Sequence, residues 1–458
     1  MHEVVNPFDL SPIGSVPDMD SGAVEEALAT AYTLSRDRSQ WKKPHERAGI
    51  LHRAMEIMKQ RRDHLAMQVA AEGGKPLIDA RVEVDRAING MELCIHEIGA
   101  VKGTEIPMGL TPAGDGRTAW TTREPIGVVV AVSAFNHPLN LIVHQVAPAV
   151  AMGCPVLVKP ASDTPLSCFE FIDILHEAGL EEGWARAVVA PRDVSEAMVT
   201  DSRVAFFSFI GSAGVGWGLR SKLAPGTRCA LEHGGAAPVI IDPSADLDAA
   251  VPSLVKGGFY HSGQVCVSVQ RVFAHSSIID DLAGRMVPVV EALKVGNAID
   301  EDTECGPLIR PKECARVAQW VDEAVDAGAT LLCGGKKLSE TTYAPTILLN
   351  PPADCTISQN EVFGPVVCLY SYDDVEAAIA QANALDVAFQ AAVFTNDLGA
   401  AMHAYRNLDA SAVMVNDHTA FRTDWMPFAG LRQSGHGVGG IPYTCHEMTI
   451  EKMIVIKA

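Results

Sequence analysis

The sequence is short of basic residues. Lysine and arginine together number 36 against 56 aspartate and glutamate residues, so the 458-residue chain has a formal net charge of −20. A field of this sign repels nucleic acid and anionic membrane surfaces at long range, and we expect neither as a partner. A small molecule is the expected partner, and an anionic nucleotide would need local help from a lysine or a helix N-terminus.

Long apolar runs are also missing. No run reaches the roughly 18 residues that a membrane-spanning helix needs, and the first residues contain neither the basic nor the apolar region of a secretory signal. The 11 cysteines are odd in number and scattered, which excludes a disulfide framework of the kind that staples small secreted domains. These absences predict a cytoplasmic protein whose cysteines are mostly small core residues.

Metal-binding motifs are absent as well. The sequence has no His-Glu-x-x-His and no paired Cys-x-x-Cys, and its 15 histidines are dispersed, so we expect no metal site. There is no internal repeat or low-complexity segment. With 48% hydrophobic and 20% charged residues, the chain has an ordinary globular composition and a length typical of about three domains.

The apolar pattern changes along the chain. Between positions 24 and 69 apolar residues recur every three or four positions, which predicts helices over the first seventy residues. From position 127 short continuous apolar runs alternate with helix-length segments, which is typical of parallel strands buried on both faces. These runs are 128–132, 156–158, 187–190, 204–209 and 238–241. A turn-rich hairpin is expected at 107–122 and a short β-rich segment at 450–457.

Three segments contain residues suited to covalent catalysis. Cys266 lies in Ser-Gly-Gln-Val-Cys-Val-Ser, Glu232 in Leu-Glu-His-Gly-Gly, and Asn136 in Phe-Asn-His-Pro. A thiol and a carboxylate beside glycines can form a thioester and hydrolyse it, and an amide can stabilise an oxyanion. Taken singly, each has a structural interpretation: a buried thiol, a carboxylate at a strand end, and a turn residue before proline.

Further segments occur in a fixed order with these three. They read Val-Leu-Val-Lys-Pro-Ala (156–161), Phe-Ile-Gly-Ser (209–212), Asn-Glu-Val-Phe-Gly-Pro (360–365) and Met-Pro-Phe-Ala-Gly (426–430). In order and spacing, the whole set resembles the aldehyde dehydrogenase superfamily over nearly the entire chain. The resemblance implies an α/β fold with a Rossmann-like cofactor domain, an α/β catalytic domain and a small β oligomerisation arm.

The resemblance also implies domain limits and an assembly. We expect the cofactor-binding domain at 1–109 and 124–234, the catalytic domain at 235–446, and the arm at 110–123 and 447–458. In the family such an arm adds to the sheet of a neighbouring subunit. A homodimer or homotetramer is therefore expected.

The reaction implied by the resemblance assigns a role to each of the three residues. Cys266 attacks an aldehyde carbon, while the Asn136 amide and the Cys266 backbone N–H hold the oxyanion. Hydride then passes to the nicotinamide of NAD or NADP, and Glu232 deprotonates the water that hydrolyses the thioester. The expected function is oxidation of a small polar aldehyde to its carboxylic acid.

Two other functions remain open at this stage. A coenzyme A-acylating relative would replace hydrolysis by thiolysis, and in such relatives the glutamate is typically absent. A non-catalytic binding or structural protein could share the fold, although it would have no reason to keep all three residues.

The cofactor is expected to contact residues that the resemblance identifies. A phosphate fits the free N–H groups where the segment 211–216 opens a helix. Lys159 would bind ribose hydroxyls, and Ser162 stands where many NAD-selective relatives carry a glutamate. Its lack of charge admits NADP, while the neighbouring Asp163 leaves the choice open. The full expected set is Lys159, Ser162, Gly211, Ser212, Gly216, Glu361 and Phe363.

The aldehyde's tail is expected among residues that flank these segments, namely His137, His144, Val265, Val267, Arg422 and Phe428. Arg422 could hold a carboxylate, phosphonate, sulfonate or hydroxyl group of the substrate. A structural ion pair with Asp424 is an equally good interpretation of this arginine. The segment 421–428 is similar to branches that act on lactaldehyde and glyceraldehyde.

Overall fold

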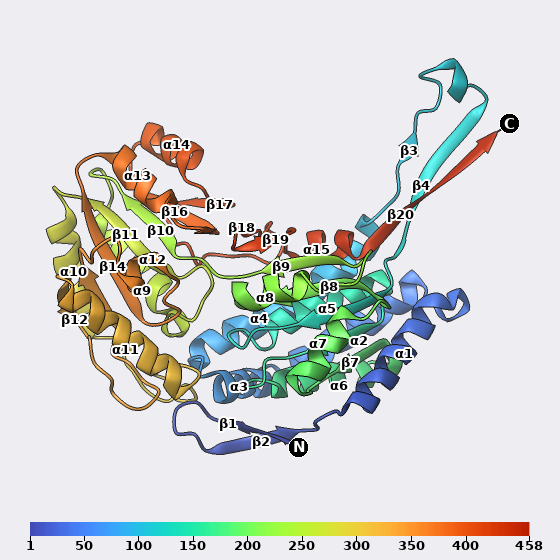
Figure 1. The fold of residues 1–458 in the computed structure, drawn as a ribbon, viewed down its shortest axis with the longest axis horizontal. Helices are drawn as coiled ribbons and strands as arrows, with labels where there is room; N and C mark the ends of the chain where they lie inside the picture. Colours follow the sequence, from blue (N-terminus) through green and yellow to red (C-terminus); the bar gives the residue numbers. More distant parts are fainter. Residues whose placement is uncertain (458) are drawn as a thin grey trace.

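The computed structural model describes residues 1–457, and two largely parallel β-sheets organise them (Figure 1). One sheet has six strands in the order β19-β9-β8-β5-β6-β7, and the other has seven in the order β12-β13-β14-β11-β10-β16-β17. Helices cover both faces of each sheet, so the predicted α/β class is confirmed. We refer to the two bodies as the six-stranded unit and the seven-stranded unit.

The six-stranded unit is parallel except for β19, which runs antiparallel to β9. Its strands are β5 (Val128–Val132), β6 (Val156–Lys159), β7 (Ala185–Ala187), β8 (Val204–Ile210), β9 (Arg228–Glu232) and β19 (Gly435–His436). Its helices are α1 (Ser21–Arg36), α2 (Pro44–Gln60), α3 (Arg62–Gly73), α4 (Leu77–Ala100), α5 (Asn140–Met152), α6 (Leu166–Glu177), α7 (Arg192–Thr200), α8 (Ala213–Arg220) and α15 (Ile441–Glu447).

Strand alternation explains why this sheet is covered on both sides. Val129 and Ala131 of β5 pack into a core shared with α2 to α6, whereas Val128 and Val130 pack into a second core with α1 and α7. Successive side chains of a strand point to opposite faces, so an uninterrupted apolar run needs two cores.

The seven-stranded unit has the same layered construction. Its strands are β10 (Ala237–Ile241), β11 (Val269–His275), β12 (Thr330–Cys333), β13 (Thr346–Leu349), β14 (Val366–Tyr372), β16 (Gln390–Phe394) and β17 (Ala412–Val415). Its helices are α9 (Leu247–Phe259), α10 (Ile279–Glu291), α11 (Pro311–Asp326), α12 (Thr356–Gln359), α13 (Val375–Asn383) and α14 (Leu398–Asn407). Helices α9 and α10 pack on one face of the sheet and α11, α13 and α14 on the other.

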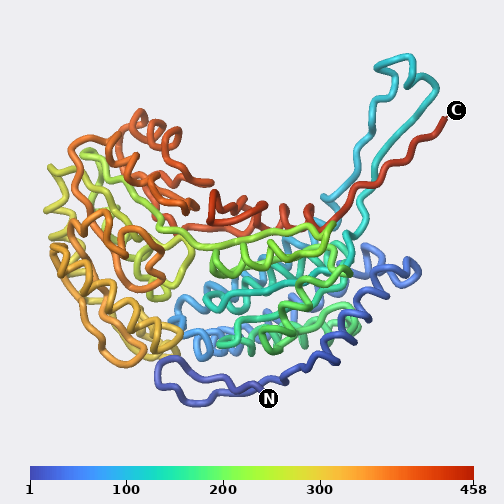
Figure 2. Tube along the Cα trace, in the orientation of Figure 1, coloured from blue at the N-terminus to red at the C-terminus, as the bar shows by residue number. Residues whose placement is uncertain are grey.

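A long β-arm, which includes the C-terminal strand, projects from the six-stranded unit, as Figures 1 and 2 show. It consists of β3 (Glu105–Ile106), β4 (Arg117–Pro125) and β20 (Thr449–Lys457), and β4 pairs along its full length with β20. The expected hairpin and C-terminal β segment are both present. The sheet exceeds the expected arm limits of 110–123 and 447–458, because β3 precedes them and β4 continues to Pro125.

Several sequence expectations need correction. The chain opens with a hairpin of β1 (His2–Val5) and β2 (Pro12–Val16), not with a helix. The apolar run 187–190 lies mostly beyond β7, because Val188 and Val189 are buried after the strand has ended. The strand β19 and helix α15, expected in the catalytic domain, belong to the six-stranded unit, since β19 pairs with β9 and α15 packs in its core.

Two short strands, β15 (Val387–Ala388) and β18 (Leu431–Arg432), form a separate small sheet by pairing with each other.

A buried glutamate closes the N-terminus of α5. Glu83 of α4 accepts hydrogen bonds from the backbone N–H groups of Leu139 (3.0 Å) and Asn140 (3.1 Å), where α5 begins. The other Glu83 oxygen binds the ammonium group of Lys75, and both side chains are fully buried. Helix N-termini leave N–H groups without intrahelical partners, so this carboxylate satisfies two of them while it balances a buried cation.

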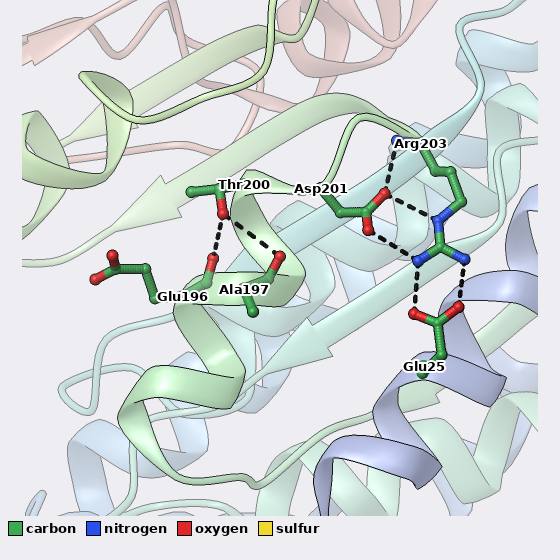
Figure 3. Close-up of polar contacts among 6 residues, drawn as sticks. All are labelled: Glu25, Glu196, Ala197, Thr200, Asp201 and Arg203. Atoms are coloured by element: carbon green, nitrogen blue, oxygen red, sulfur yellow. Dashed lines mark hydrogen bonds and ion pairs between the residues drawn. The ribbon is translucent and has the colours of Figure 1, made fainter.

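A partly exposed ion-pair cluster joins α1 to the segment between α7 and β8 (Figure 3). The guanidinium group of Arg203 contacts Glu25 of α1 at 2.6 and 2.7 Å and Asp201 at 2.8 and 2.9 Å. At the end of α7, the Thr200 hydroxyl donates to the Glu196 carbonyl at 2.9 Å. Because water competes for these charges, we expect the cluster to contribute little to stability.

Replacement of Glu83 by Gln tests the importance of the buried pair. The amide oxygen can still accept from the start of α5, but the Lys75 ammonium loses its counter-charge, and the free energy of unfolding should fall by about 3–5 kcal/mol. Glu25→Gln, at the exposed Arg203 cluster, is the matched control and should cost about 0–1 kcal/mol. Urea unfolding followed by circular dichroism measures both, and equal losses in the two variants would contradict the assignment.

Candidate active site

A cavity of about 1000 Å³ lies between the two units. Asn136 follows β5, Gly211 follows β8 and Glu232 ends β9, so the carboxyl ends of three neighbouring parallel strands open into it, as is usual for ligand sites in such sheets. The predicted site residues that line it are Asn136, His137, His144, Gly211, Ser212, Glu232, Val265, Cys266, Val267, Glu361, Phe363, Arg422 and Phe428.

Three predicted cofactor residues are not among those lining the cavity. Lys159 ends β6 and donates to the Pro160 carbonyl at 3.1 Å, and Ser162 is exposed beside the lining residue Asp163. Gly216 lies inside α8, where a Cβ atom would overlap the His233 ring. Gly216 therefore lets α8 pack on His233 and has a packing role in the structure.

The thiol follows a strained turn. His261 and Ser262 have φ values of 47° and 55°, a left-handed conformation that such residues rarely adopt. The Ser262 hydroxyl holds the turn by donating to the Gly306 carbonyl at 2.6 Å, and the Gln264 amide oxygen accepts from the Ile309 backbone at 2.9 Å. These bonds fix the chain that leads to Cys266.

Asn136 reaches this turn from the six-stranded unit. Its side-chain Nδ2 donates to the Gln264 carbonyl at 2.9 Å, and the residue is only 5% exposed. An amide nitrogen has two hydrogens, so one remains after this bond. The contact joins the Asn136 donor to a residue two positions before Cys266 and connects the two units at the cavity.

The ionisable groups of the cavity have strongly shifted pKa values. Burial, reinforced by the carboxyl groups of Glu361 and Glu232, raises the pKa of the Cys266 thiol to about 12. Burial raises the pKa of Glu232 to about 7, although the nearby Arg422 opposes the shift. Near neutral pH the thiol is protonated, whereas Glu232 titrates and can act as a base.

A second carboxyl group lies near the thiol. Burial raises the pKa of Glu361 to about 8, and its Oε1 atom has no hydrogen-bond partner among residues 1–457. Two glycines make room for the two carboxyl groups, because a Cβ atom at Gly234 would overlap Glu361 and one at Gly439 would overlap Glu232. Side chains in these positions would displace either carboxyl group.

Arg422 does not pair with Asp424, so that interpretation is wrong. Asp424 instead binds Arg86 of α4 at 2.7 Å and His144 of α5 at 2.7 Å. The Arg422 guanidinium carbon lies 3.6 Å from the centroid of the Phe428 ring, and its buried Nη1 has no hydrogen-bond partner among the described residues. Because burial lowers its pKa only to about 10, this group remains a cation at neutral pH.

Sequence reasoning missed two stripes of lining residues. One stripe lies on α4 and consists of Ile78, Asp79, Val82 and Arg86; the other begins just before α11 and consists of Arg310, Glu313, Arg316 and Trp320. Both have the spacing of three or four residues that places side chains on one helix face. The apolar residues Ile78 and Val82, four positions apart, were the available signal in the sequence of α4, and the structure leaves both side chains exposed. Within residues 1–457, no group of three or more His, Cys, Asp or Glu side chains is arranged to hold a metal ion.

Comparison with known proteins gives one consistent result. The model of the aldehyde dehydrogenase family matches residues 1–454. The chain is 36% identical over 455 residues to 3-sulfolactaldehyde dehydrogenase from Priestia aryabhattai, covering 99% of this chain and 94% of that protein. It is 35% identical over 459 residues to lactaldehyde dehydrogenase from Methanocaldococcus jannaschii, covering 99% and 97%.

Solved structures agree with these sequence matches. Aldehyde dehydrogenase 21 from Physcomitrella patens, in complex with the reaction product succinate, superposes with a TM-score of 0.96 at 33% identity, over 99% of this chain and 94% of that chain. Glyceraldehyde-3-phosphate dehydrogenase from Methanocaldococcus jannaschii, complexed with NADP, gives a TM-score of 0.94 at 34% identity, over 100% and 99%.

The environment of Glu232 predicts an unusual titration. In infrared difference spectra of the wild type against Glu232→Gln, the carboxylic acid band should disappear as the pH rises through about 7, because burial disfavours the charged form. Arg422→Leu should move this midpoint upward, since the guanidinium group favours the ionised carboxylate. A midpoint near the ordinary value of 4.5 would show that water reaches the carboxyl group.

Proposed function

The chain belongs to the aldehyde dehydrogenase family, and we propose that it oxidises a small polar aldehyde to the carboxylic acid with NAD or NADP as hydride acceptor. The observation that carries this proposal is the convergence of Cys266, Glu232 and Asn136 on one cavity between two sheets. Within residues 1–457, no helix has both the length and the apolar character needed to cross a membrane.

The cavity fits a nicotinamide dinucleotide. It extends from Cys266 to Gly211 and Ser212 at the N-terminus of α8, where no side chain caps the first N–H groups, and such groups bind phosphates. The unpartnered Glu361 carboxyl oxygen suits a ribose hydroxyl. Phe363 stands edge-on to Phe135 at 5.8 Å and offers a wall for the nicotinamide riboside. Lys159 and Ser162 would meet the adenosine ribose.

The first half of the reaction begins with the neutral thiol. Cys266 transfers its proton to ionised Glu232, directly or through one water, and its sulfur bonds to the aldehyde carbon. The carbonyl oxygen becomes an oxyanion that accepts from the remaining Nδ2 hydrogen of Asn136 and from the Cys266 backbone N–H. Loss of one such donor typically costs about 10²–10³ in rate.

The second half hydrolyses a thioester. NAD or NADP, when bound, would supply the acceptor for the hydride that leaves the former aldehyde carbon, and the oxyanion held by Asn136 and the Cys266 backbone would become the thioester carbonyl. Glu232 first releases to solvent the proton that it took from Cys266, and then takes a proton from water while the oxygen of that water attacks the thioester carbon and the bond to Cys266 sulfur breaks. The Cys266 thiolate recovers its proton from Glu232, and the acid leaves. A base with a pKa of about 7 can both accept and release protons at neutral pH.

Arg422 supports a substrate with an anionic or hydroxylated tail. Its guanidinium group lies over the Phe428 ring, and its unpartnered Nη1 makes a charge-assisted hydrogen bond available to such a tail. The relatives named for 3-sulfolactaldehyde and lactaldehyde, and the structure with succinate, concern proteins whose named compounds carry such groups.

Assembly and location complete the proposal. In β20, Met453, Ile454, Val455 and Ile456 are each at least 44% exposed, and only one edge of this strand is paired. An exposed apolar edge strand is a template for pairing with another chain, which supports a homodimer or homotetramer. All 11 cysteines are free thiols, which supports the cytoplasm as the compartment.

Glu232→Gln tests hydrolysis against transfer to coenzyme A. The amide can take a proton neither from the thiol nor from water, so the variant should form about one equivalent of NAD(P)H per active site more slowly than the wild type and then stall. Rapid-mixing absorbance at 340 nm over an aldehyde panel measures the burst, and Cys266→Ala, which should give none, is the control. Coenzyme A-dependent turnover in the wild type would favour the acylating alternative, and absence of NAD(P)H from the wild type would contradict the oxidation itself. A burst missing only from Glu232→Gln would show that Glu232 acts chiefly on the thiol.

Arg422→Leu tests recognition of the substrate's tail. For an aldehyde with a carboxylate, sulfonate or hydroxyl group, kcat/KM should fall roughly ten- to a hundredfold. Propanal should lose only the smaller factor that follows from the raised pKa of Glu232, and this factor should shrink as the pH of the assay rises. Arg422→Lys keeps the charge without the planar group and should lose less. Equal losses for both kinds of aldehyde in Arg422→Leu would show that the arginine supports the cavity wall and does not select the substrate.

A further inference from the structure

An ion pair crosses the cavity from one unit to the other. Asp163 lies in the loop that follows β6 of the six-stranded unit, and Arg310 is the residue just before α11 of the seven-stranded unit. The Arg310 Nε donates to Asp163 Oδ1 at 2.7 Å, and Nη2 contacts the second carboxylate oxygen. Both residues line the cavity, so the pair is part of its wall.

The surroundings fix the Asp163 side of this pair. The His2 ring nitrogen Nε2 lies 2.7 Å from the backbone carbonyl of Ser162, so the N-terminal hairpin holds the loop that carries Asp163. Lys159 and Glu313 are the other charged groups whose fields act on Asp163 or Arg310. The Arg310 Nη1 makes no hydrogen bond within residues 1–457, which leaves two donors available.

We propose that the Asp163–Arg310 pair determines how well the cavity accepts the 2′-phosphate that distinguishes NADP from NAD. The inference rests on the proposed function, which places the adenosine ribose beside Ser162. An unpaired carboxylate at Asp163 would repel a phosphate dianion, and Arg310 cancels that repulsion through its bidentate contact. Its Nη1 group is then free to donate to the phosphate. Arg310 is a specificity-determining residue, and the charge of Asp163 tunes its effect.

Single and double substitutions distinguish cofactor selection by the Asp163–Arg310 pair from a role in which the pair only holds the two units together. Arg310→Gln exposes the Asp163 charge and should disfavour NADP, whereas Asp163→Asn releases the full charge of Arg310 and should favour NADP. In the double variant both charges are absent, so the cofactor preference should return toward that of the wild type. A purely structural clamp predicts another pattern, in which all three variants lose affinity for both cofactors equally.

The experiment measures cofactor binding and turnover separately. Dissociation constants for NADP and NAD come from quenching of tryptophan fluorescence without aldehyde, since Trp320 lines the same cavity, and kcat/KM is measured with saturating aldehyde. The NADP-to-NAD preference should fall about three- to tenfold in Arg310→Gln and rise by a similar factor in Asp163→Asn. Arg81→Gln breaks a comparable bidentate pair with Glu301, away from the cavity lining, and should leave the preference unchanged.

The outcomes distinguish this inference from the proposed function. An unchanged preference in both single variants, in an enzyme that still oxidises aldehydes, overturns the inference and leaves the function intact. Equal losses for NAD and NADP, with a lower melting temperature, also overturn it in favour of a clamp. A wild-type chain that binds neither cofactor would overturn the proposed function.

Discussion

Two charged residues of α4, the buried Glu83 and the partly buried Arg86, hold the segments that carry Asn136 and Arg422, and the expected substrate site depends on these contacts. Glu83 holds the start of α5 at Asn140, four residues after Asn136, and Arg86 one turn further along α4 binds Asp424. Asp424 in turn anchors the segment that carries Arg422. A charge that is removed from water must find a partner of fixed geometry, so these contacts specify positions in a way that apolar packing alone would not.

The same principle separates the roles of two similar carboxyl groups. Glu232 and Glu361 are both buried and both act on the thiol, yet Arg422 stands near the first and Arg316 near the second. Both carboxyl groups therefore have raised pKa values, but the charged side chain near each of them is different. Environment, not residue type, decides which of them is suited to exchange protons with a thiol and with water.

The sequence predicts the elements that local patterns encode. Continuous apolar runs identify β5, β6, β8 and β10, because burial on both faces leaves a direct trace in composition. The motif around Cys266 likewise identifies the turn at the cavity. Pairings between distant residues leave no such trace: Arg310 and Asp163 are 147 positions apart, and Arg86 and Asp424 are 338 apart. The interpretation of Arg422 failed for this reason, since the partner of Asp424 comes from α4 and not from its own loop.

The connectivity of the two units has a consequence for synthesis on the ribosome. The seven-stranded unit is built from one continuous stretch, β10 to β17, whereas the six-stranded unit needs β19 and α15 from near the end of the chain to complete its sheet and core. The first 230 residues therefore leave the ribosome with one sheet edge and part of their core open, and they must wait for most of the remaining chain. Contacts at such sequence separation are slow to form. The six-stranded unit, most of which is synthesised first, can therefore close its sheet and its core only after β19 and α15 have been made.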